Sequence, residues 1–230
     1  MEQNNHLLSE LEKVRSQFYI FYQLTKALRT SLRLDEIVYI ILTCLTAHYG
    51  LSFNRAILFL VDNRNKNITG FMGIGPMNQK EATDIWKHIN QEKKSLFELI
   101  KAYPLIKRGE IKPEFMEFVR SLSFPLEKSS GIVFDATTSQ NPTHIKSTNS
   151  LLKTDPLIKK LNLEEFLIMS LWVKNQPQGL ILVDNNITRK PITEEDISIF
   201  KMFVEQAIGA IENSQAFEET LVQAHTDALT

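Results

Sequence analysis

The sequence predicts an α+β fold in which an antiparallel sheet lies between long helices at the two ends of the chain. Apolar residues recur at helical spacing before position 50 and after position 194, whereas 53–74 and 165–184 have the composition and alternation of strands. These strand segments occur in pairs joined by short polar turns, which is typical of hairpins. Strands outnumber the crossover helices that a parallel sheet would need, so the sheet is expected to be antiparallel.

Residues 5–49 are predicted to form one long helix with a bend near Ser31. The first part of this helix carries apolar residues spaced alternately by four and three, the pattern of a coiled-coil seam. The seam comprises Leu7, Leu11, Val14, Phe18, Phe21, Thr25, Leu28 and Leu32. It favours a dimer, because it is longer than one small domain can cover; an amphipathic helix packed on its own domain is the alternative.

The middle of the chain alternates between short helices and strands. Residues 53–61 are apolar on both faces, as in a central strand, and 68–74 return after a polar turn as its hairpin partner. The elements expected next are a helix with an apolar stripe over 82–100, a short helix from Pro113, a strand over 122–126, a short helix over 129–139, a brief strand over 143–147 and a helix after Asp155-Pro156.

A second hairpin, 165–174 with 179–184, precedes the last helix. Thr193 is the expected N-cap, with Asp196 in the reciprocal capping position. The helix carries two apolar series that are one residue out of phase: Ile197, Phe200, Val204, Ala207 and Ile211, then Phe217, Leu221, Ala224 and Ala228. Such a phase change fits a coiled coil with two registers or an ordinary irregular helix end, and the sequence leaves both open.

Composition excludes several classes of protein. The 230 residues are 43% hydrophobic and 23% charged with a net charge of −1, so no basic field attracts nucleic acid. No apolar stretch is long enough for a membrane span, and the polar start is not a secretory signal. The single cysteine, Cys44, cannot form an internal disulfide. These features predict a cytoplasmic protein.

Three pieces of sequence carry a resemblance to a known family. They are Phe53-Asn54-Arg55-Ala56 entering the first strand, Gly73-Ile74-Gly75-Pro76 closing the second, and Gly179-Leu180-Ile181-Leu182-Val183-Asp184 followed by Ile192-Thr193-Glu194-Glu195-Asp196. Their order resembles that of a GAF domain, the small-molecule sensor fold of signalling proteins. The resemblance implies a six-stranded antiparallel sheet flanked by helices, with a ligand pocket on one face and a dimerising helix pair on the other.

The resemblance places the pocket lining between about 122 and 139. Phe124 and Leu126 are expected to supply apolar walls, and Ser130, Asp135 and Thr138 polar groups. The alternative is that the Ser and Thr side chains cap helices and that Asp135 faces water. The residue set of cyclic-nucleotide-binding members is present only in fragments, so a cyclic nucleotide is disfavoured.

No catalytic residue or metal site is predicted. Cys44 lies within an apolar helix pattern, which favours a buried, inert thiol. The five histidines have no metal-ligand spacing, and no glycine-rich phosphate loop is present. The sequence therefore names no cofactor and predicts no enzymatic activity for these residues.

The last residues, Asp227-Ala228-Leu229-Thr230, resemble the D-x-L-T that opens a GGDEF (diguanylate cyclase) domain. Together with the GAF resemblance, this predicts a coiled-coil helix (1–30), a sensory domain (31–212) and a signalling helix (213–230) before a cyclase. The expected partners are a second copy, bound through the terminal helices, and an unidentified small molecule. A ligand-free dimerisation spacer and the sensor of another output, such as a histidine kinase, are the alternatives.

Overall fold

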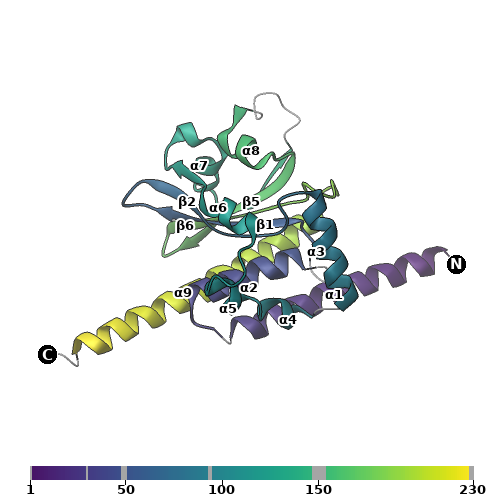
Figure 1. Ribbon diagram of the computed structural model, residues 1–230, viewed down its shortest axis with the longest axis horizontal. Coiled ribbons are helices and arrows are strands. Elements are labelled where there is room, and N and C mark those ends of the chain that lie inside the picture. The colour runs from purple at the N-terminus through teal and green to yellow at the C-terminus, as the bar shows by residue number, and fades with distance from the viewer. Residues whose placement is uncertain (1, 30, 48–50, 93–94, 147–153, 228–230) are drawn as a thin grey trace.

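The computed structural model describes residues 2–29, 31–47, 51–92, 95–146 and 154–227 (Figure 1). Its centre is a six-stranded antiparallel sheet in the order β3-β2-β1-β6-β5-β4. The strands are β1 (Arg55–Asp62), β2 (Asn67–Ile74), β3 (Ser123–Pro125), β4 (Thr143–Lys146), β5 (Glu165–Val173) and β6 (Gln176–Asp184). The predicted α+β class, both hairpins and the brief strand after 143 are confirmed.

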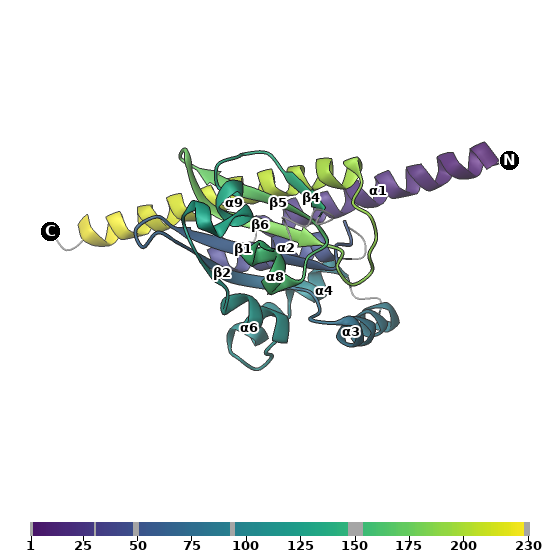
Figure 2. The same ribbon diagram turned by 90° about the horizontal axis from the view of Figure 1, so that it is seen from above.

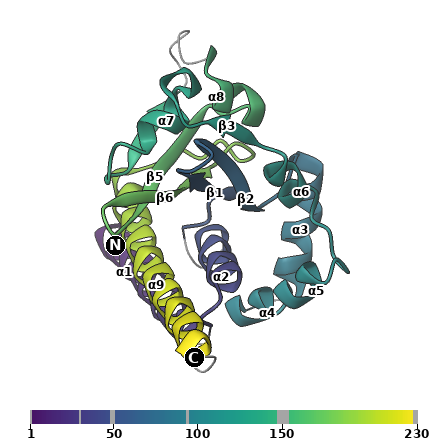
Figure 3. The same cartoon turned by 90° about the vertical axis from the view of Figure 1, so that its left-hand side faces the viewer.

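Two apolar layers enclose the sheet. On one face, α1 (Glu2–Leu28), α2 (Leu34–Thr46) and α9 (Glu194–Asp227) form a layer together with α4 (Leu96–Ile100) and α5 (Tyr103–Lys107). On the other face, α7 (Ile132–Ala136) and α8 (Pro156–Leu161) cover the sheet, as Figure 3 shows. Helix α6 (Glu114–Arg120) packs against β2 and contributes to both layers.

The predicted single helix over 5–49 is wrong, because α1 ends at Leu28 and α2 begins at Leu34. The break is held by a local polar turn. The hydroxyl of Ser31 accepts a hydrogen bond from the Arg33 backbone N–H (3.1 Å) and donates one to Glu36 (2.6 Å). A serine hydroxyl that bonds nearby groups in this way competes with the helical hydrogen bonds, so the apolar periodicity continues while the helix does not.

The predicted helix over 82–100 is also two helices, α3 (Gln79–Glu92) and α4. Ser95 and Glu98 form a capping box at the start of α4, in which each side chain accepts a hydrogen bond from the other residue's backbone N–H. This reciprocal pair satisfies donors that a new helix leaves unpaired and therefore begins a separate helix at Leu96.

The long helices extend past the sheet. The N-terminal half of α1 and the C-terminal half of α9 project at opposite ends of the molecule, as Figure 2 shows. The other halves of the two helices meet on the sheet, where the rings of Phe21 (α1) and Phe203 (α9) lie edge to face with centroids 6.0 Å apart. No helix among the described residues is long and apolar enough to cross a membrane.

Candidate ligand cavity and the polar network beside it

The five residues predicted to line a pocket lie on the α7–α8 face of the sheet, or at its margin. Phe124 is buried, with its ring centroid 6.1 Å from that of Phe59, and Leu126 is half-buried against the same apolar cluster. Ser130 is buried, but its hydroxyl donates to the Pro125 carbonyl (2.5 Å).

Asp135 and Thr138 are exposed, and the Thr138 hydroxyl donates to the Asp135 carbonyl (2.7 Å). The structure therefore gives each of the two hydroxyls a local backbone partner and does not gather the three polar side chains around a common space. Contact between a ligand and these residues stays a prediction.

A cavity of about 630 Å³ lies on the other side of the molecule, between α2 and the segment that connects β2 to β3. Its walls come from five places in the chain: α2, the residues that enter β1, the end of β2, helices α3 to α6, and the loop between β6 and α9. They include Tyr39, Thr43, Phe53, Asn54, Ile74, Ile85, Trp86, Leu99, Ala102, Ile106, Met116, Thr188 and Lys190. Its volume is in the range of small-molecule sites, about 300–1,000 Å³.

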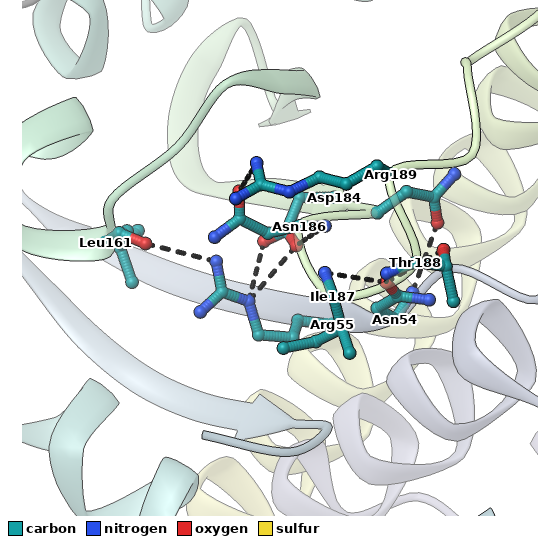
Figure 4. A network of polar contacts seen from close by, with 9 residues as sticks. Asn54, Arg55, Leu161, Asp184, Asn186, Ile187, Thr188 and Arg189 are labelled. Carbon is teal, nitrogen blue, oxygen red and sulfur yellow. Dashed lines mark hydrogen bonds and ion pairs between the residues drawn. The ribbon is translucent and has the colours of Figure 1, made fainter. Parts of the chain in front are cut away.

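Next to the cavity wall at Asn54 lies a network around a buried ion pair that does not itself line the cavity (Figure 4). The Arg55 Nε lies 2.9 Å and 3.1 Å from the two carboxylate oxygens of Asp184, and the two side chains are 5% and 0% exposed. Arg55 also donates to the Leu161 carbonyl (3.1 Å), and Asp184 accepts from the Asn186 backbone N–H (2.8 Å). Burial raises the pKa of the Asp184 carboxyl, and the guanidinium opposes that rise.

Asn54 extends this network into the cavity wall. Its side-chain oxygen accepts hydrogen bonds from the backbone N–H groups of Ile187 and Thr188 (2.9 Å and 2.7 Å) and from the Thr188 hydroxyl (3.1 Å). Its own N–H donates to the Asp184 carbonyl (2.8 Å). Asn54 thus fixes the loop that leads from β6 into α9, as the close-up in Figure 4 shows.

A second polar contact joins α2 to α5, the helix that contributes Ile106 to the cavity lining. The Asp35 carboxylate, at the start of α2, accepts from the Tyr103 hydroxyl (2.9 Å) and from the Lys107 ammonium, both on α5. We call these three residues the α2–α5 clamp. Burial works to raise the pKa of Asp35, but the hydrogen bonds from Lys107 and Tyr103 outweigh it and lower the pKa to about 2.

Two further reactive side chains, Cys44 and His144, are buried or hydrogen-bonded. Cys44 is buried in α2, as predicted, and burial raises the pKa of its thiol. His144 shares a hydrogen bond with Glu165 (2.8 Å). Among the residues that the structure describes, no group of three or more His, Cys, Asp and Glu side chains is placed to hold a metal ion.

The strand order and the helix pair on one face match solved structures over nearly their whole length. A methyl-accepting chemotaxis protein segment aligns with a TM-score of 0.58 and 16% identity, covering 84% of this chain and 98% of that one. The GAF domain of a phosphoenolpyruvate-protein phosphotransferase from Acinetobacter aligns with a TM-score of 0.56 and 14% identity, covering 88% and 97%. The chain has the fold of a GAF domain.

A third structure, the phycoerythrobilin-bound GAF domain of a cyanobacterial phytochrome, aligns with a TM-score of 0.57 and 11% identity, covering 88% and 97%. No family model and no curated protein sequence matches this chain. At these identities the likeness concerns the fold, and what this chain binds must be argued from its own residues.

Sequence reasoning missed the cavity, although two of its walls were noted as motifs. Phe53-Asn54 and Gly73-Ile74-Gly75-Pro76 were assigned to strand ends, and both line the cavity. The third signal was the length of the segment between β2 and β3, which holds α3, α4, α5 and α6. No local pattern shows that these helices fold back toward α2.

Proposed function

We propose that this GAF domain is a sensory module that dimerises through its terminal helices and controls a C-terminal output domain, a diguanylate cyclase. The proposal keeps the division into a coiled-coil helix (1–30), a sensory domain (31–212) and a signalling helix (213–230). In it, a small molecule changes the arrangement of the helix pair and thereby brings two output domains together or holds them apart. A cytoplasmic location follows from the proposed output.

The observation that carries the dimer is an unpaired apolar stripe on α1. Leu11, Val14 and Phe18 are 61%, 45% and 74% exposed, although all three belong to the heptad pattern. A different stripe of the same helix, Ile20, Leu24 and Ala27, is buried in the domain. Because α1 packs on its own domain through one stripe and presents a second to solvent, a second copy is the partner that a self-complementary heptad stripe fits.

Helix α9 supports the coupling. The first apolar series, from Phe200 to Ile211, is buried in the domain, and the Ser214 hydroxyl donates to the Leu32 carbonyl (2.6 Å). Phe217 opens the second series and is exposed. The phase change therefore coincides with the point where α9 leaves the domain, which is where a change of register would pass from the sensor to the next domain.

The dimer is tested by light scattering of the Phe18→Glu variant. We expect the parent chain to have the mass of two copies and Phe18→Glu to have the mass of one, because the change places a charge at the most exposed apolar position of the stripe. Tyr19→Glu is the control, since Tyr19 is exposed on α1 outside the heptad series. A monomeric parent, or equal effects of the two variants, would refute the dimer through this stripe.

The output is tested with the natural gene product that contains these residues. We expect it to convert GTP into cyclic di-GMP, and one residue inserted near Gln215 to change that activity by rotating the helix beyond the domain. Absence of cyclase activity would favour another output, such as a histidine kinase. Regulation that the insertion leaves unchanged would contradict coupling through α9.

A further inference from the structure

We propose that the cavity between α2 and the β2–β3 segment binds an uncharged, largely apolar molecule with an aromatic ring. This site is on the opposite side of the sheet from the pocket that the family resemblance implies. It is built from the chain's own long connection between β2 and β3. The proposal deepens the proposed function by naming an input, but binding itself does not depend on the output domain.

The lining sets the chemical class. Most of the lining is apolar: Phe53 comes from the residues that enter β1, Ile74 from the end of β2, Ile85 and Trp86 from α3, Leu99 and Ile106 from α4 and α5, and Met116 from α6. An indole and a phenyl ring with a thioether nearby favour an aromatic occupant, since rings and sulfur both pack well against aromatic surfaces. A mainly apolar lining with a few polar groups is typical of small-molecule sites.

The charges in the lining disfavour an anion. Of the residues that the structure describes, the charged ones that line the cavity are Glu81, Glu98 and Lys190. No arginine is among these described lining residues, so they offer no planar fork that binds phosphate or carboxylate in two places. Nucleotides and other phosphorylated molecules therefore do not fit this lining.

The same carboxylates do not require a cationic ligand either. Glu81 accepts a hydrogen bond from the Met77 backbone N–H (2.6 Å). Glu98 accepts two from Ser95, from its N–H and its hydroxyl (2.7 Å each). Both therefore already stabilise turns at the starts of α3 and α4, and an uncharged occupant leaves these bonds intact.

The location gives the occupant a route to the signalling helix. Tyr39, Thr43 and Thr46 line the cavity from α2, and α2 packs along α9 on the helical face of the sheet. The α2–α5 clamp ties α5, which forms another wall of the cavity, to the start of α2. An occupant that separates or draws together these walls would therefore act on the helix that contacts α9.

The test uses two fluorescent probes with the same type of ring system. N-phenyl-1-naphthylamine is uncharged at neutral pH, and 8-anilino-1-naphthalenesulfonate carries a negative charge. We expect saturable 1:1 binding of the uncharged probe to the 230-residue chain, at least tenfold tighter than binding of the sulfonate. Equal or tighter binding of the sulfonate, or no saturable binding, would overturn the proposal.

The site is located with cavity-filling variants. Ala102→Phe and Ile85→Trp place a ring in the lining, and each should weaken binding of the uncharged probe at least tenfold. Lys101→Phe adds a ring at the exposed neighbouring position and should leave binding unchanged. Circular dichroism identifies any variant that fails to fold. Binding that a folded filling variant leaves unchanged would refute the site.

Trp86 supplies a local reporter, because the chain has only one other tryptophan, Trp172. In Trp172→Phe, excitation of the remaining indole should transfer energy to the bound uncharged probe, and Trp86→Phe should transfer much less. The monomeric Phe18→Glu variant should keep this signal. A result in which Phe18→Glu stays dimeric but the signal is kept would reject the dimer through the α1 stripe and leave the ligand site standing.

Discussion

Replacing Arg55 with methionine isolates the energetic role of the buried ion pair. The methionine side chain resembles the unbranched stem of arginine, so the change chiefly removes the cation. Asp184 keeps its hydrogen bond from Asn186, but it loses both contacts with the guanidinium, and the Leu161 carbonyl loses its donor. Because Asp184 is 0% exposed, water does not replace the lost partner. Breaking a buried pair in this way costs about 3–5 kcal/mol.

The loss should depend on pH in a defined direction. Without the guanidinium, the pKa of Asp184 rises further above its value of about 3.9 in the unfolded chain. A group whose pKa is raised in the folded state stabilises that state below the unfolded pKa, and this contribution is lost as pH rises through the folded pKa. The deficit of Arg55→Met should therefore be smaller near pH 5 than near pH 8.

Urea unfolding followed by tryptophan fluorescence measures both effects. Arg108→Met is the matched control, since it breaks an ion pair with Glu110 in which both side chains are more than half exposed. The control should lose no more than about 1 kcal/mol. Adding Asp184→Asn to Arg55→Met should recover part of the loss by removing the unpaired charge. A loss in Arg55→Met as small as in the control, or one independent of pH, would refute the reasoning.

Three further predictions concern stability, each measured by urea midpoint. Gly70→Ala should destabilise the protein by about 1–3 kcal/mol, because the added Cβ would overlap the backbone oxygen of Val119. Gly209→Ala is the control: its Cβ would meet nothing within 4 Å, so it should stabilise α9 by about 0.5–1 kcal/mol. Equal effects of the two variants would contradict the close packing of α6 on β2. Asp35→Asn should flatten the pH dependence of the unfolding free energy between about pH 4 and pH 2. The lowered pKa of Asp35 stabilises the folded chain above the pKa of the unfolded state, and this contribution is lost as pH falls toward the folded pKa. An unchanged acid profile would argue against the α2–α5 clamp. Thr193→Ala should cost about 1 kcal/mol by removing the N-cap hydroxyl of α9, whereas no loss would mean that packing alone sets the start of that helix.

The sheet could be predicted from sequence because its signal is local. Residues 55–74 and 165–184 carry a strand pattern and their own turns, so each hairpin is visible without knowledge of the rest of the chain. At the break between α1 and α2 the sequence predicts only a bend near Ser31, because the apolar periodicity runs through it. The decisive contact is the hydrogen bond from Ser31 to Glu36, and a side-chain contact of this kind leaves no mark on hydrophobic spacing.

The start of α4 is marked by a local signal in the sequence. Ser95-Leu96-Phe97-Glu98 matches the S-x-x-E pattern of a capping box, and the structure contains both of its hydrogen bonds. Recognising it would have divided the predicted helix over 82–100. It would not have placed the cavity, because that requires the packing of α3 and α5 around α2, which depends on contacts such as Asp35 with Tyr103 across 68 positions of sequence.

The position of α2 decides what kind of regulation the cavity can exert. Helix α2 is fixed at its start by the α2–α5 clamp, and its middle and its last turns line the cavity. A ligand shifts an equilibrium only by the difference between its affinities for two arrangements. An occupant of a rigid cavity would stabilise the domain without changing α9, whereas one that fits better when the α5 wall moves would also change how α2 packs on α9. Releasing the clamp with Asp35→Asn separates these cases: if the cavity wall is the moving part, the uncharged probe should bind with a changed affinity, and if the cavity is rigid, the affinity should stay the same while only stability falls.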